Sequence, residues 1–165
     1  MRDLTSGEIA AEIYTAQKDT GERVSHIVLM GIGEPLHNFD NVMDFLDIIS
    51  CPEGVNIGMR NISLSTCGLV PRIDKLAERK LQLTLSVSLH APDNVTRSSM
   101  MPVNDAFPLE KLIPACRRYQ KTTGRRISFE YSMVNGVNDS PQMAKKLADL
   151  IRGCLLYTSD AADDL

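Results

Sequence analysis

Small and polar residues follow three apolar segments of this chain. The first segment ends in Gly31-Ile32-Gly33-Glu34-Pro35, the second ends in Ser65-Thr66, and the third ends in Ser88-Leu89-His90. Glycine leaves backbone carbonyls uncovered, so this turn could present carbonyl oxygens and the Glu34 carboxylate to an ammonium group. A strand-terminating turn with a solvated glutamate explains the same residues, and both interpretations stay open.

Hydroxyl and imidazole groups end the second and third segments. Ser65-Thr66 could bond a carboxylate or a ribose, although capping of the following turn is the simpler role. Ser88-Leu89-His90 brings a hydroxyl and a histidine to the end of the third segment, where a lone histidine is most often structural. Glu130 interrupts a fourth apolar segment and faces either a polar barrel interior or solvent. Three successive segments therefore each carry polar groups at their carboxyl ends.

The cysteines and histidines show no metal-binding spacing. The cysteines lie at positions 51, 67, 116 and 154, which matches no zinc, haem or iron–sulfur pattern. The three histidines are equally scattered. We therefore predict no metal site in this chain.

Composition indicates one ordinary domain. The chain has 165 residues, of which 43% are hydrophobic, and a net charge of −3, which excludes a disordered chain, a coiled coil and a collagen-like repeat. The longest stretch without a polar side chain, Ile27 to Gly33, is far shorter than the roughly 20 residues that cross a bilayer. No secretory signal is visible, so we expect a cytoplasmic protein without a membrane partner.

One local charge cluster stands out against the acidic balance. The run from Lys111 to Arg126 contains six Lys or Arg residues, and only Glu110 beside it is acidic. Such a patch can bind RNA phosphates. A solvated helix face is the simpler explanation.

Helical and strand-like patterns alternate along the chain. The first helix begins at a Thr5-x-x-Glu8 capping box and ends before Gly21. The predicted strands are Val24–Gly31, which we expect to be buried on both faces, Ile62–Thr66, Leu83–Leu89 and Ile127–Val134. The later helices are predicted over Phe39–Ile49, around Ile73–Ala77, over Leu109–Thr122 with Pro114 in its first turns, and over Pro141–Leu150 after a Ser140 cap.

Strands that alternate with helices pair in parallel through right-handed crossovers, so the fold class is α/β. A barrel and a doubly wound open sheet both satisfy this order. In either one, function belongs at the carboxyl ends of the strands. Four strands are too few to close a barrel, so we expect an incomplete one.

Six segments resemble consecutive blocks of the radical S-adenosylmethionine (SAM) RNA methyltransferases of the RlmN and Cfr type. They are RDLTSGEI, HIVLMGIGEPLHNFDNV, RNISLSTCGLVP, LSVSLHAPDNVTRSSMMPVN, RRISFEYSMVNGVNDS and AKKLADLIRG. The blocks run from Arg2 to about Gly153 in family order, and the combination of GEPLHN, SLHAP and EYSMVNGVNDS is highly specific. The RlmN branch is favoured because it is the widespread housekeeping one.

The resemblance implies a partial (β/α)6 radical SAM barrel over residues 1–153. It also implies methylation of carbon 2 of an adenine in 23S rRNA, with some tRNAs as further substrates. The implied cofactors are SAM and a [4Fe–4S] cluster, with a reductant such as flavodoxin as partner. The resemblance maps SAM contacts onto Gly33, Glu34, Ser65, Ser88, Leu89 and His90.

The residues that carry radical generation and methyl transfer are expected outside this chain. The family's C-x-x-x-C-x-x-C cluster loop would lie just before Arg2, and its methyl-carrying cysteine beyond Gly153. Residues 154–165, CLLYTSDAADDL, fit no family block, and we expect them to be an artefactual tail. The chain alone should therefore be inactive, with no catalytic residue and no metal ligand, and retain part of the SAM cradle.

Four alternatives remain beside this hypothesis. A Cfr-like enzyme would methylate carbon 8 instead, and another radical SAM enzyme would share the cradle. A generic α/β-barrel enzyme would need a phosphate-binding glycine loop near the last strand, and none is seen. A non-catalytic interaction fragment would need an exposed apolar patch, which the open edges of a truncated barrel provide.

Overall fold

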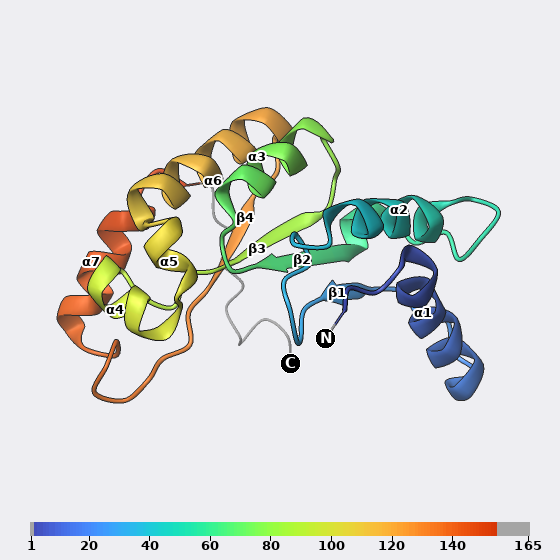
Figure 1. The fold of residues 1–165 in the computed structure, drawn as a ribbon, viewed down its shortest axis with the longest axis horizontal. Helices are drawn as coiled ribbons and strands as arrows, with labels where there is room; N and C mark the ends of the chain where they lie inside the picture. The colour runs from blue at the N-terminus through green and yellow to red at the C-terminus, as the bar shows by residue number, and fades with distance from the viewer. Residues whose placement is uncertain (1, 155–165) are drawn as a thin grey trace.

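Four parallel strands form one sheet in the computed structural model, which describes residues 2–154 (Figure 1). They are β1 (Ile27–Leu29), β2 (Ile62–Thr66), β3 (Thr84–Ser88) and β4 (Ile127–Glu130). Each strand pairs with the next one in sequence, in the order β1-β2-β3-β4. An unreversed order is the winding of an α/β barrel, because a doubly wound sheet reverses direction. The predicted α/β fold with four parallel strands is confirmed.

Helices connect the strands. The α-helices of the described chain are α1 (Ser6–Thr20), α2 (Phe39–Ser50), α3 (Val70–Glu78), α4 (Asn94–Met100), α5 (Val103–Ala106), α6 (Leu109–Thr123) and α7 (Pro141–Ile151). A 3-10 turn, η1, covers Met59–Asn61. Helices α2, α3 and α6 lie on one side of the sheet, where α3 packs along α6, and α1 packs against α2 (Figure 1). The helices α4 and α5 were not predicted, although the Asp93 side chain caps α4 by accepting from Thr96 N–H at 3.0 Å.

The first helix forms as its capping box predicts. Thr5 Oγ1 accepts from Glu8 N–H at 3.3 Å, and Glu8 Oε2 accepts from Thr5 N–H at 2.9 Å. At the other end, Gly21 adopts φ 71°, a left-handed conformation that glycine reaches without strain, and donates to the Gln17 carbonyl. Local sequence alone therefore sets both ends of α1.

The hydrophobic core lies between the sheet and the helices on its covered side. Alternate strand residues point to this side, and Ile62, Leu64, Leu85, Val87 and Ile127 are all buried there. The other side of the sheet receives the remaining strand residues, which are mostly polar.

Two predicted strands are too long. The fourth strand, β4, ends at Glu130 rather than at Val134. The first strand covers only Ile27–Leu29, and Val28 is 59% exposed, because β1 is an edge strand of the described sheet and no described helix covers its second face. Pro114 lies in the first turns of α6, as predicted, but far enough inside the helix that the Glu110 carbonyl loses its helical N–H partner. Burial of Leu112, Ile113 and neighbouring residues holds α6 together despite this loss.

Candidate functional site

The uncovered face of the sheet is lined with hydroxyl groups. Alternation along the strands places these side chains on one face: Ser63 and Ser65 of β2, Thr84, Ser86 and Ser88 of β3, and Ser128 and Glu130 of β4. Ser63 Oγ and Ser86 Oγ lie 3.1 Å apart across neighbouring strands. A single-wound sheet with helices on one side leaves this second face free for polar chemistry.

Glu130 faces this hydroxyl-lined surface. Its Oε2 accepts hydrogen bonds from Ser88 Oγ at 3.2 Å and from Ser65 Oγ at 3.4 Å. The polar-interior alternative for Glu130 is therefore the correct one. Within the described chain no Lys or Arg forms a salt bridge with this carboxylate.

Glu34 joins the end of β1 to the end of β2. Cys67 N–H donates to Glu34 Oε2 at 2.7 Å, and Leu36 N–H donates to Glu34 Oε1 at 2.9 Å. Gly33, just before Glu34, has a backbone φ of 111°, a value that residues other than glycine rarely adopt. The glycines of this turn thus let the chain fold back so that the carboxylate reaches the next strand.

These elements enclose a small cavity at the carboxyl ends of the strands. Its volume is about 160 Å³. The lining consists of Met30, Gly31, Gly33, Glu34, Pro35, Ser65, Thr66, Cys67, Ser88 and Glu130. Four of the six predicted SAM-contacting residues line this cavity, and its lining contains two carboxylates and no Lys or Arg.

The other two predicted residues, Leu89 and His90, lie beside the cavity rather than in its lining. The Leu89 side chain is fully buried, and the N–H groups of both residues donate to the Glu130 carbonyl at 3.0 and 3.2 Å. His90 has φ 55° and its Nδ1 accepts from Ser132 N–H at 3.1 Å, while Asn138 Nδ2 donates to the His90 carbonyl at 2.6 Å. Burial lowers the pKa of His90. The histidine side chain is thus held in its neutral form against the loop after β4.

Cys67 is poorly suited to act as a thiolate. It lines the cavity, but burial and the neighbouring Glu34 carboxylate raise the pKa of its thiol to about 12. Across residues 2–154, no three His, Cys, Asp or Glu side chains group closely enough to hold a metal ion.

Sequence reasoning missed two residues of this region. Glu130 was recognised as unusual but not assigned, because one carboxylate in a strand does not reveal which face it occupies. Arg97, which lies behind the cavity and is fully buried, was not singled out at all. No sequence signal marked it, since an arginine in a short helix is normally exposed.

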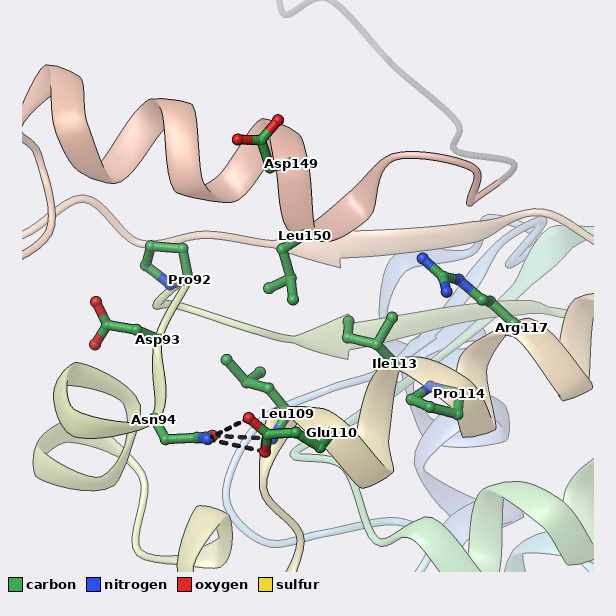
Figure 2. Close-up of a pocket in the computed structure, with 10 residues that line it drawn as sticks. All are labelled: Pro92, Asp93, Asn94, Leu109, Glu110, Ile113, Pro114, Arg117, Asp149 and Leu150. Carbon is green, nitrogen blue, oxygen red and sulfur yellow. Dashed lines mark hydrogen bonds between the residues drawn. The ribbon is translucent and has the colours of Figure 1, made fainter.

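A larger cavity, of about 490 Å³, lies away from these residues. Figure 2 shows it between α6 and α7, where Leu150 points toward Ile113 and Leu109, and Asn94 is bonded to Glu110. It shares no lining residue with the smaller cavity. The predicted tail from Cys154 onward lies, except for Cys154 itself, outside the described residues.

Known proteins resemble this chain over most of its length. The family described as "Radical SAM superfamily" matches residues 2–150. The "Probable dual-specificity RNA methyltransferase RlmN" of Clostridium novyi is 53% identical over 157 residues, covering 95% of this chain and 46% of the relative. The protein of the same name from Desulforudis audaxviator is 51% identical over 155 residues, covering 94% of this chain and 49% of the relative.

A solved structure shares the same fold. The crystal structure of a radical SAM methyltransferase from Sphaerobacter thermophilus superposes with a TM-score of 0.91 at 46% identity, covering 95% of this chain and 47% of that chain. This chain therefore spans about half the length of the relatives it matches. None of the helices between residues 2 and 154 is long and apolar enough to cross a membrane.

Proposed function

Because this chain belongs to the radical SAM superfamily, we propose that a full-length protein carrying it methylates RNA and binds SAM in the cavity at the carboxyl ends of β1, β2 and β3. The cofactors that the family implies are SAM and a [4Fe–4S] cluster. The finer assignment follows the RlmN-named relatives: carbon 2 of an adenine in 23S rRNA, with some tRNAs as further substrates. Flavodoxin as reductant and a cytoplasmic location belong to the same proposal.

The observation that carries the proposal is the meeting of Gly33, Glu34, Ser65 and Ser88 in one cavity. Its chemistry fits the amino-acid end of SAM. Carboxylates attract the ammonium group, and hydroxyls can donate to the ligand carboxylate. The volume of about 160 Å³ suits this part of the ligand rather than all of it, since sites for drug-sized ligands span roughly 300–1,000 Å³.

Each lining group has a distinct task in this proposal. Glu34 holds the turn after β1 against β2 through two backbone N–H groups, and its remaining lone pairs can accept from the ligand ammonium. Ser65 and Ser88, which donate to Glu130, can turn toward a ligand carboxylate or ribose. Leu89 and His90 act by fixing the backbone at the end of β3.

Unlike SAM, the [4Fe–4S] cluster has no set of ligands among the described residues. The proposal places those ligands in another part of the full-length protein. When SAM is bound to such a cluster, the pair supplies both a methyl group and, after one-electron reduction, the radical needed to functionalise an unreactive aromatic carbon.

The test is a two-stage assay on the full-length protein. SAM binding is measured by titration calorimetry, and RNA methylation by mass spectrometry of nucleosides from a 23S rRNA fragment after anaerobic reconstitution with iron, sulfide and reduced flavodoxin. The expected product is 2-methyladenosine. Formation of 8-methyladenosine would favour the Cfr-like alternative, and a protein that neither binds SAM nor methylates RNA would refute the proposal.

A further inference from the structure

Arg97 is the most deeply buried charged residue of the described chain, with 0% of its surface exposed. Burying a guanidinium away from water is costly unless its donors are satisfied. No carboxylate forms a salt bridge with it in the described chain. Something other than an ion pair must therefore stabilise the buried charge of Arg97.

The guanidinium donates to acceptors from three separate segments. Nη2 donates to the Cys67 carbonyl at 2.7 Å and to the Ser88 carbonyl at 3.2 Å, and Nε donates to the Leu89 carbonyl at 3.2 Å. Nη1 donates to Asn104 Oδ1 at 2.9 Å. The rigid planar fork of arginine can reach all of these acceptors at once, whereas a lysine ammonium cannot.

Three of the four acceptors are backbone groups at the ends of strands that bear predicted ligand contacts. Cys67 follows β2, Ser88 ends β3, and Leu89 follows β3. Arg97 therefore joins the carboxyl ends of two neighbouring strands from behind the cavity.

Cys67 connects this arginine to the turn after β1. Its carbonyl accepts from Arg97, and its N–H donates to Glu34, both at 2.7 Å. Glu34 and Arg97 thus both hydrogen-bond to the backbone of Cys67, Glu34 at its N–H and Arg97 at its carbonyl. A continuous set of charge-assisted hydrogen bonds runs from the β1 turn through β2 to β3.

Tight packing around the guanidinium leaves it little freedom. A Cβ atom added at Gly68 would lie 3.4 Å from Arg97 Nη2 and 3.0 Å from Leu112 Cδ1, and Gly68 has φ 107°. Asn104, which orients Nη1, is itself buried and donates to Ser98 Oγ at 2.9 Å. Gly68, Leu112 and Asn104, none of which lines the cavity, thus restrict the orientation of the arginine.

We infer that Arg97 is a positioning residue for ligand binding, which sets the spacing of the strand ends that carry Glu34, Ser65 and Ser88. This inference rests on the proposed function, since it assumes that the cavity binds SAM. Arg97 does not itself line the cavity and acts through the backbone of Cys67, Ser88 and Leu89.

The experiment compares R97Q and R97K with wild type in the full-length protein. SAM affinity is measured by titration calorimetry, well below the unfolding temperature of each variant. We expect R97Q to raise the Kd for SAM by about tenfold or more, the effect of losing one charged hydrogen bond, and R97K to fall between R97Q and wild type.

Two controls separate positioning from simple destabilisation. L76A removes a buried side chain of α3 that does not line the cavity, and should lower stability without changing the Kd for SAM. R23Q removes an arginine that also donates to two backbone carbonyls, those of Val55 and Asn56, but at a remote and exposed place. If R97Q and R97K bind SAM as wild type does, or change the Kd no more than L76A, the inference is wrong. R97K decides the question if R97Q does not fold.

A second measurement does not depend on SAM. Amide hydrogen exchange at Cys67 and Leu89 should be faster in R97Q, by about tenfold beyond any change at Leu64 in the middle of β2. Unchanged exchange at Cys67 and Leu89 would also overturn the inference. A wild-type protein that binds no SAM contradicts the proposed function instead, and the exchange rates then decide whether Arg97 positions these strand ends.

Discussion

The Glu34 carboxylate accepts the Cys67 N–H at 2.7 Å, across 33 positions of sequence. This contact bonds the turn after β1 to the end of β2 and brings two predicted ligand-binding segments to one cavity. The same carboxylate accepts the Leu36 N–H, so it also shapes its own turn.

Replacing Glu34 with Gln should loosen this turn. The amide offers one oxygen in place of two, so one of the two N–H donors loses its acceptor. We expect the free energy of unfolding to fall by about 1–3 kcal/mol, as measured by urea denaturation. The control is E12Q on the exposed face of α1, which should change stability by less than about 0.5 kcal/mol. Equal losses of stability in E34Q and E12Q would show that the two hydrogen bonds to Glu34 do not stabilise the fold.

Asp93 should make stability depend on pH in the acid range. Lys146 and the Thr96 N–H hold the pKa of Asp93 at about 2, below its usual value near 4. A lowered folded-state pKa means that this stabilisation is present above about pH 4 and is lost as pH falls from about 4 to 2. Urea denaturation at pH 2.5, 4 and 7 should show that D93N removes part of this dependence.

The control for Asp93 is D19N, at an exposed position of α1. It should leave the pH dependence of unfolding as in wild type. At pH 7, D93A should lower the free energy of unfolding by about 1 kcal/mol more than D93N does, because alanine also removes the N-cap hydrogen bond of α4. If D93N and wild type lose stability in parallel between pH 4 and 2, the ion pair with Lys146 does not stabilise the protein.

Ser65 and Ser63 provide a matched pair for the proposed SAM site. Both lie on the hydroxyl-lined face of β2, but only Ser65 lines the cavity. In the full-length protein, S65A should weaken SAM binding by about fivefold to tenfold, the effect of one hydrogen bond, whereas S63A should not. Titration calorimetry of both variants checks this. Equal losses of SAM affinity in S65A and S63A would indicate that both substitutions disturb the sheet rather than a ligand contact.

The basic run from Lys111 to Arg126 should add RNA affinity in the full-length protein. Arg118 is paired with the Asp74 carboxylate through two hydrogen bonds, at 3.0 and 2.8 Å. Arg117 donates to the Arg152 carbonyl at 3.1 Å, but neither Arg117 nor Lys121 forms a salt bridge within the described residues, so these two are the better candidates for phosphate contacts. R117Q/K121Q should lower RNA affinity and reduce the slope of log K against log salt by about 1 per lost contact. Filter binding at several salt concentrations measures both. An unchanged slope would leave this run as a solvated helix face.

The 165-residue chain alone should hold no [4Fe–4S] cluster after anaerobic reconstitution with iron and sulfide. Cluster ligands must be thiolates, and burial raises the pKa of both the Cys67 and Cys116 thiols to about 12. Visible absorption after desalting should therefore show no stoichiometric cluster. A stoichiometric cluster signal that disappears in C67A would contradict this prediction and the placement of the ligands elsewhere.

Several parts of the fold could be predicted from sequence because they depend on neighbouring residues. The capping box of Thr5 and Glu8 and the left-handed Gly21 set the ends of α1 through contacts within four residues. The strand over Ile62–Thr66 was also predicted correctly, since Ile62 and Leu64 alternate with Ser63 and Ser65, a period-two pattern typical of a strand with one apolar face. Parallel pairing then brought the polar strand ends to one edge of the sheet.

Other features were decided only by the tertiary structure. The direction of Glu130 depended on which face of the sheet the helices cover, and this follows from the strand order rather than from residues near Glu130. Val28 is exposed because its side chain lies on the sheet face that no described helix covers. Pro114 lies inside α6, which packs along α3.

Arg97 shows the limit of sequence reasoning most clearly. The Cys67 carbonyl, one of its four acceptors, lies 30 positions away and approaches only when β2 and β3 pair side by side. Sequence determined which residue types end each strand, since turns and caps are local. The tertiary structure decided which of them meet and what holds them, because a buried charge is stable only where distant backbone groups converge on it.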